Sequence, residues 1–138
     1  MPIARDLHIL DRIRVLNKSI ERSILFRTEA TILRNLYQNG DPFRLNPKQI
    51  LQLVPITSGA LTTAIGRLEK NNLVIRLADE QDGRGQWVQL TNSGIEMAKQ
   101  QQETLTALDE VVFGNFDDIE KLRFKKLVEK LQESLERI

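Results

Sequence analysis

The chain has 138 residues, of which 41% are hydrophobic and 28% charged, so it is long enough for one domain with a real core and too short for two. It has no cysteine and one histidine, which excludes disulfides, thiol chemistry and cysteine zinc sites and argues against a histidine metal site. No apolar run has transmembrane length and the N-terminus lacks a signal peptide's apolar segment, so we expect a cytoplasmic protein without membrane contact.

The N-terminal part predicts two amphipathic helices. Apolar residues recur at helical spacing over residues 3–24, with a break expected near residues 17–19. This helix carries more exposed apolar surface than a monomer needs, which implies a partner. A second helix is predicted over residues 28–38, where Gly40 can supply a left-handed cap and Pro42 prevents continuation.

Residues 43–91 have the order of a winged helix-turn-helix. A brief extended piece at 43–45 precedes a short helix over 47–53, which Pro55 ends. A second helix spans residues 57–71, with Leu61, Ala64, Ile65 and Leu68 on its buried face. Two strands, 73–77 and 86–91, then form a hairpin.

The outward face of the 57–71 helix is small and polar, unlike a helix that faces bulk water. Small side chains permit close approach to a groove, and hydroxyl groups and arginine are usual donors to bases and phosphates. Arg84, between two glycines at the hairpin tip, suits a narrow minor groove, with Asp82 bracing the loop. Arg44 and Lys48 are weaker candidates for phosphate contacts, and Trp87 is expected to pack between the wing strands.

The C-terminal part predicts two further helices. The first runs from a Thr91 cap to about Phe113, with a polar middle that suits a connector between two lobes. Gly114 interrupts it, and Asp117 and Asp118 begin the last helix with charge that favours the helix dipole. That last helix carries a long apolar stripe, which predicts that it packs against other helices. The net charge of +1 hides a basic N-terminal part and an acidic C-terminal third, so any contact with a polyanion must be local.

The segment 56–94 closely resembles the recognition helix and wing of the MarR family of bacterial winged-helix regulators. Its matching residues are Leu61, Thr62, Leu68, Glu69, Leu73, Val74, Arg76, Asp79, Asp82, Arg84, Val88, Leu90, Thr91 and Gly94. Asn72 stands where the family usually has glycine, which asparagine can replace because it tolerates a left-handed backbone. Thr63 and Gly66 replace commonly charged positions, so the family's base contacts do not carry over there.

The resemblance implies a mainly α fold with a small β-hairpin wing, as a single domain over 1–138. The DNA-binding lobe would span 28–91 and the connector helix 91–113, while segments 1–26 and 114–138 would form the helical dimerisation region.

The sequence therefore predicts a homodimeric transcriptional regulator, more specifically a repressor, that binds a pseudo-palindromic operator in double-stranded DNA. The resemblance also implies a small aromatic or phenolic effector. The residues expected at the DNA are Thr57, Ser58, Gly59, Thr62, Thr63, Arg67, Asp82, Arg84 and Gly85. The alternative is a winged-helix protein–protein interaction module that does not itself bind DNA. The sequence offers no phosphate loop, paired nucleophile or acid pair, so we expect no enzyme, no catalytic residue, no cofactor and no metal site.

Overall fold

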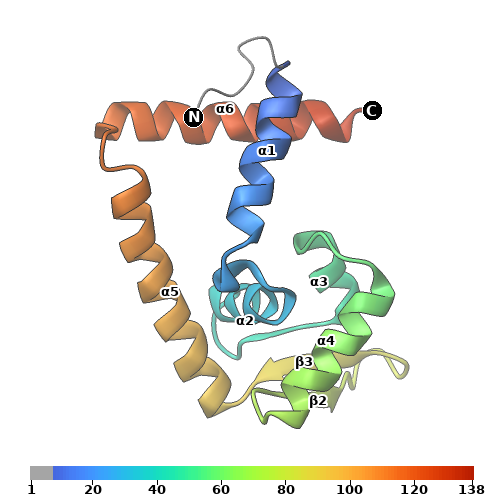
Figure 1. The fold of residues 1–138 in the computed structure, drawn as a ribbon. Coiled ribbons are helices and arrows are strands. Elements are labelled where there is room, and N and C mark those ends of the chain that lie inside the picture. Colours follow the sequence, from blue (N-terminus) through green and yellow to red (C-terminus); the bar gives the residue numbers. More distant parts are fainter. Residues whose placement is uncertain (1–7) are drawn as a thin grey trace. The chain divides into compact units, whose positions relative to one another are not determined.

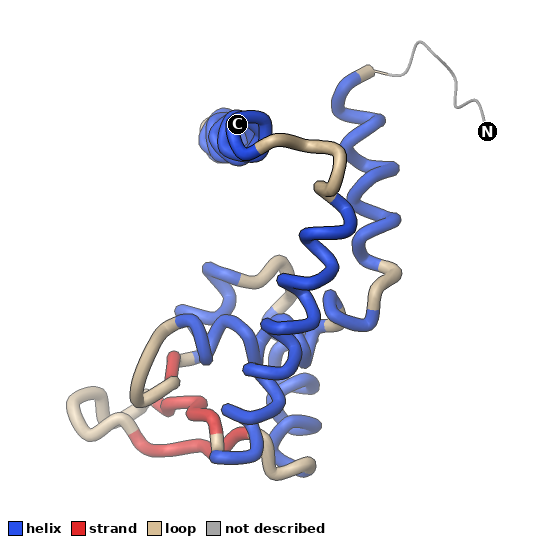
Figure 2. The backbone as a smooth tube through the Cα atoms, turned by 90° about the vertical axis from the view of Figure 1, so that its left-hand side faces the viewer, coloured by secondary structure: helices blue, strands red, loops and turns tan. Residues whose placement is uncertain are grey.

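The computed structural model describes residues 8–138, which form two compact units (Figures 1 and 2). The first unit extends to Gln102 and the second runs from Glu103 to the end of the chain. In chain order the elements are α1 (Ile9–Glu21), the 3₁₀ turn η1 (Ile24–Phe26), α2 (Thr28–Gln38), β1 (Arg44–Leu45), α3 (Pro47–Leu53), α4 (Ser58–Lys70), β2 (Val74–Ala78), β3 (Gln86–Leu90), α5 (Asn92–Val112) and α6 (Asp118–Glu136). The division into dimerisation, DNA-binding and connector segments stays a prediction.

Helix α1 is continuous over residues 17–19, so the predicted break there is wrong. The hydroxyl of Ser19 donates to the carbonyl of Val15 at 3.2 Å, which satisfies this polar side chain within the helix. The chain leaves the helix only after Glu21, and Ser23 caps the η1 turn by accepting from the Leu25 amide. The first part of the predicted helix, up to residue 7, lies outside the described residues.

The core of the first unit lies between α2, α3, α4 and the sheet. Its fully buried side chains include Ile32, Leu33, Leu36, Ile50, Leu68, Val74 and Val88. Helix α3 begins with a capping box, in which Asn46 and Gln49 each accept from the other's backbone amide. Local sequence thus fixes where this short helix starts, and the apolar spacing fixes which face it buries.

The sheet has three antiparallel strands in the order β1-β3-β2, one more than the predicted hairpin. β1 pairs Arg44 with Gln89 and Leu45 with Val88. The hairpin strands lie within one residue of their predicted ends, and Val88 and Leu90 face the core as expected from the alternation. Asn72 adopts the left-handed backbone predicted for it, with a φ of 59°.

Gly94, in the first turn of α5, lies against the backbone that precedes β2. A Cβ atom placed on it would be 2.0 Å from the carbonyl oxygen of Leu73 and 3.2 Å from a methyl carbon of Leu90. Thr91 caps this helix as predicted, since its hydroxyl oxygen accepts from the Gly94 amide at 3.0 Å. Only glycine permits this close approach of α5 to the sheet.

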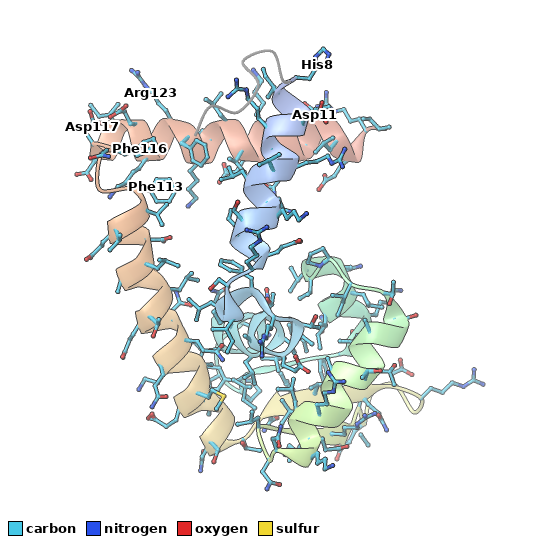
Figure 3. The ribbon with its side chains drawn as sticks, viewed as in Figure 1. His8, Asp11, Phe113, Phe116, Asp117 and Arg123 are labelled. Atoms are coloured by element: carbon cyan, nitrogen blue, oxygen red, sulfur yellow. The ribbon has the colours of Figure 1, made fainter. Side chains whose placement is uncertain are left out.

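In the second unit, α5 ends in a small aromatic cluster before α6 begins. The ring of Phe113 lies 5.3 Å from that of Phe116 and 5.9 Å from that of Phe124 (Figure 3 labels the first two). Asp117 then starts α6 through a capping box with Glu120, as the acidic cap predicted. Within residues 8–138, no helix is both long enough and apolar enough to cross a bilayer.

Candidate nucleic-acid interface

Helix α4 has its apolar face in the core and its small polar face in solvent. The buried residues are Leu61, Ala64, Ile65 and Leu68, as the spacing predicted. Thr57 is the N-cap, and its hydroxyl oxygen accepts from the Ala60 amide at 3.1 Å. This predicted DNA contact therefore has a structural role as well, because it orients the first turn of the helix.

The outward face places Ser58, Gly59, Thr62 and Thr63 together, all exposed. The hydroxyl groups of Thr62 and Thr63 donate to the carbonyls of Ser58 and Gly59, at 3.0 and 3.2 Å. Their protons are therefore used within the helix, and their oxygen lone pairs and methyl groups remain available. Such groups can accept from base amino groups and contact thymine methyl groups in a major groove.

Two glycines, Gly59 and Gly66, leave the outward face of α4 without protruding side chains at their positions. A Cβ atom added to Gly59 or to Gly66 would meet no atom within 4 Å. Packing therefore does not require glycine at either position, and the fold would tolerate a side chain there. A flat ridge without bulky or charged side chains is what close approach to another surface requires.

Arg67 lies further along α4 and is held by α2. Its Nη1 lies 3.3 Å from Glu29 Oε1, and its side chain is 69% exposed against 30% for Glu29. An exposed pair of this kind contributes little to stability, about 0.2–1 kcal/mol. Arg67 can consequently exchange this carboxylate for a phosphate at small cost.

Figure 1 shows the loop between β2 and β3. Two aspartates and a glycine shape it. Asp79 Oδ1 accepts from the amides of Gln81 and Asp82, at 3.0 and 3.3 Å, and Asp82 Oδ1 accepts from the Arg84 amide at 3.2 Å. A Cβ atom on Gly85 would lie 3.2 Å from that of Asp79. Asp82 and Gly85 thus define the loop geometry, while Arg84 is exposed at its tip.

Arg44 lies over the ring of Trp87, with its guanidinium carbon 4.6 Å from the ring centroid. This stacking explains why both side chains are partly buried and joins β1 to β3 on the outer side of the sheet. A phosphate contact by Arg44 stays a prediction, and Lys48 is exposed on α3.

Sequence reasoning missed Arg34, the buried charged residue of α2. It is 5% exposed, donates from Nη1 to the carbonyl of Leu25 and lies over the Phe26 ring, 5.3 Å from its centroid. Desolvation by burial lowers the pKa of Arg34 below its ordinary value. The residue attaches η1, and hence the end of α1, to α2. The available signal was that Arg34 lies at helical spacing from Ala30 and Tyr37, two residues of the predicted inner face.

The chain resembles known transcriptional regulators over most of its length. Residues 25–85 match the model of the MarR family. The uncharacterized HTH-type transcriptional regulator YwhA of Bacillus subtilis is 32% identical over 100 residues, which cover 72% of this chain and 70% of YwhA.

Solved structures extend the similarity to nearly the whole fold. A MarR protein from Peptoclostridium difficile is 25% identical, with a TM-score of 0.80 over 99% of this chain and 94% of that one. A Listeria monocytogenes protein solved with 26mer DNA shares the fold at 17% identity, with a TM-score of 0.79 over 94% of this chain and 89% of that one. These similarities confirm the predicted winged helix-turn-helix fold of the MarR type.

Proposed function

Because the chain belongs to the MarR family of transcriptional regulators, we propose that it is a homodimeric repressor that binds a pseudo-palindromic operator. Transcriptional regulators are not enzymes, so family membership also confirms the exclusion of an enzyme. In this proposal each subunit inserts the first turns of α4 into a major groove and the Arg84 loop into an adjacent minor groove. The two half-sites would lie about 34 Å apart, one helical turn.

The observation that carries the proposal is the combination of α4 and the wing in one lobe. The outward face of α4 is flat and uncharged around Gly59, Thr62 and Thr63, and the adjoining loop holds one exposed arginine on a braced backbone. A flat ridge suits the floor of a groove, and a single cation suits a narrow one. Ser58 and Arg67 extend the proposed contact along α4, while Thr57, Asp82 and Gly85 shape the backbone that makes it.

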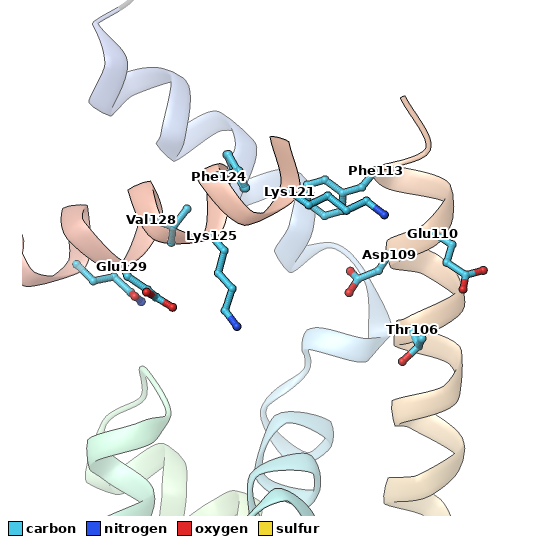
Figure 4. A pocket seen from close by; sticks show the side chains of 10 residues that line it. Thr106, Asp109, Glu110, Phe113, Lys121, Phe124, Lys125, Val128 and Glu129 are labelled. Atoms are coloured by element: carbon cyan, nitrogen blue, oxygen red, sulfur yellow. The ribbon is translucent and has the colours of Figure 1, made fainter. Parts of the chain in front are cut away.

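Homodimerisation is supported by apolar surface that the chain leaves exposed. Helices α1 and α6 have no buried residue in this single chain. Their exposed large apolar residues are Ile9, Leu10, Ile13, Val15, Leu16, Ile20, Ile119, Leu122, Phe124, Leu127, Val128 and Leu135. In the second unit a hollow of about 580 Å³ lies between the end of α5 and α6, with Phe113, Phe124 and Val128 among its lining residues (Figure 4). Apolar surface of this extent is typical of an interface between subunits.

Two further parts of the proposal rest on the family resemblance. A regulator acts where the DNA is, so we place the protein in the cytoplasm of a bacterial cell. A small aromatic or phenolic effector would relieve repression by lowering the affinity for the operator.

The proposal is tested by selecting random duplex DNA on the purified protein, after its dimeric state has been measured by sedimentation. We expect an enriched inverted repeat and an affinity that falls steeply between two salt concentrations. A folded dimer that enriches no sequence would contradict operator binding and favour the protein–protein interaction module.

Arg84→Ala is expected to weaken binding to specific and random duplexes alike, because a wing arginine contacts phosphates more than base edges. The slope of log affinity against log salt should become shallower by about one unit per wing. Lys99→Ala, which removes one positive charge from an exposed position of α5, is the matched control. Equal slopes for both variants would show that the wing does not contact DNA.

A further inference from the structure

The outward face of α4 limits which base edges the helix can read. Between Ser58 and Gly66 the helix has no charged residue and no asparagine or glutamine, and Arg67 is its first charged residue. Guanine is usually read by arginine or lysine, and adenine by asparagine or glutamine, through paired hydrogen bonds to the major-groove edge. The first turns of α4 therefore lack the side chains that make such paired contacts.

Thr63 is the side chain of this segment that is best placed to meet a groove. An α-helix turns by about 100° per residue, so Thr63 lies about 200° from the buried Leu61, nearly opposite the core, whereas Thr62 lies about 100° from it, at the side. Gly59 and Gly66 lie about one helical turn before and after Thr63. Because neither glycine has a side chain, Thr63 protrudes from a helix side that is otherwise bare between residues 59 and 66.

The hydroxyl proton of Thr63 is already used within the helix. The hydroxyl group donates to the carbonyl oxygen of Gly59 at 3.2 Å, and the side chain is exposed. Two groups then remain for a base edge, the methyl group and the lone pairs of the hydroxyl oxygen. The major-groove edge of guanine presents the acceptors N7 and O6, which find no donor on Thr63. Thymine presents a methyl group and its partner adenine presents an amino donor, so a T·A pair matches what Thr63 offers.

We propose that Thr63 reads one T·A pair in each operator half-site, through contact between its methyl group and the C5-methyl group of thymine. This contact, which rests on the proposed function, identifies a base that α4 recognises in the operator. The free energy of burying one methylene-sized apolar group corresponds to about a fourfold change in affinity. The preference therefore belongs to one base pair per half-site and differs from a general preference for A·T-rich DNA.

The first test replaces each thymine of the selected operator in turn by deoxyuridine, which lacks the C5-methyl group and keeps every hydrogen-bonding group. Titration with the full-length protein should show a symmetry-related pair of positions at which affinity falls about fourfold per half-site, and about fifteenfold when both half-sites are changed. Cytosine at these positions should also weaken binding, and 5-methylcytosine should bind about fourfold more tightly than cytosine because it restores the methyl group. A scan without such a pair of positions, or equal affinities for cytosine and 5-methylcytosine, would overturn the proposal.

The second test uses two variants of Thr63 and an operator with deoxyuridine in one half-site. Thr63→Ser removes the methyl group and keeps the hydroxyl group, so the ratio of the affinities for the thymine and deoxyuridine operators should fall from about fourfold to about one. Thr63→Val keeps a methyl group and removes the hydroxyl group, so the same ratio should stay at about fourfold. Position 63 is exposed, so both variants should keep the fold, which circular dichroism and thermal denaturation check.

Thr62→Ser is the matched control, because it removes a methyl group from the neighbouring residue. The hydroxyl group of Thr62 donates to the Ser58 carbonyl in the same way, at 3.0 Å. In this variant the affinity ratio should stay at about fourfold. A ratio that persists in Thr63→Ser, or that is lost in Thr62→Ser instead, would overturn the assignment to Thr63.

Failure of this contact and failure of the proposed function give different results. If the protein binds an operator and its affinity is insensitive to deoxyuridine at every thymine, the contact is overturned and the proposed function stands. If the folded dimer enriches no duplex, the proposed function fails and the contact fails with it.

Discussion

Gly94→Ala is expected to lower the free energy of unfolding by about 3 kcal/mol, the upper range for an overpacked position. The new methyl group would lie 2.0 Å from the carbonyl oxygen of Leu73, which is a backbone atom and cannot move aside by changing rotamer. That carbonyl also accepts from the Thr91 amide at 3.0 Å, so displacing it breaks the cap region of α5 as well. Urea denaturation should report the loss, with a fall in melting temperature of about 10 °C.

Gly66→Ala is the matched control for this prediction. Gly66 is also helical, but a Cβ atom there meets nothing within 4 Å. Alanine should therefore stabilise the protein by about 0.5–1 kcal/mol through its higher helix propensity. If both alanine variants are stabilised, the close contact between Gly94 and Leu73 does not exist in solution.

Most of the fold could be predicted because its signals are local. The helix over residues 28–38 was predicted with the bounds that α2 has, since a glycine and a proline end it and its apolar spacing is regular. Caps at Asn46, Thr91 and Asp117 likewise fixed the starts of α3, α5 and α6. Capping and periodicity act within a few residues, so a single sequence carries them in full.

The features that were missed depend on residues far apart in the chain. The extended piece predicted at 43–45 is confirmed as β1, but its pairing with residues 88–89 was not predicted, because two residues offer no periodicity of their own. Arg44 stacks on Trp87, which follows it by more than forty positions. Arg34 is buried because η1 folds back over α2 and supplies a carbonyl. The false break at residues 17–19 came from polar residues that, in α1, are satisfied along the helix itself.

The candidate site likewise has features that the sequence predicted and features that depend on the three-dimensional structure. The sequence predicted which face of α4 is buried and which loop carries Arg84. It could not predict that the hydroxyl groups of Thr62 and Thr63 donate within the helix or that Glu29 holds Arg67, because both depend on three-dimensional geometry. The DNA contacts themselves stay predictions, which a change of charge on α4 tests most directly.

Gly59→Glu is expected to lower operator affinity at least about 100-fold, because like charges brought together at an interface cost several kcal/mol. The carboxylate would stand on the ridge that enters the major groove, next to Thr62 and Thr63. The same change should raise the melting temperature. Position 59 lies in the first turn of α4, where glutamate replaces a poor helix former and favours the helix dipole, for a gain of about 1 kcal/mol. Affinity is measured by titration with the selected operator, and stability by thermal denaturation.

A lower operator affinity together with a higher melting temperature would show that the interface is lost while the fold is kept. A destabilising variant could not distinguish these two causes of weaker binding. Ser93→Glu is the matched control, because Ser93 is exposed two residues after the Thr91 cap of α5, as Gly59 is two residues after the Thr57 cap of α4. Both variants add one negative charge to the first turn of a helix, so long-range repulsion from the DNA should be similar. A 100-fold loss confined to Gly59→Glu places the start of α4 at the DNA. Equal operator affinities for the two variants would show that α4 does not contact the DNA, however well the rest of the fold matches its relatives.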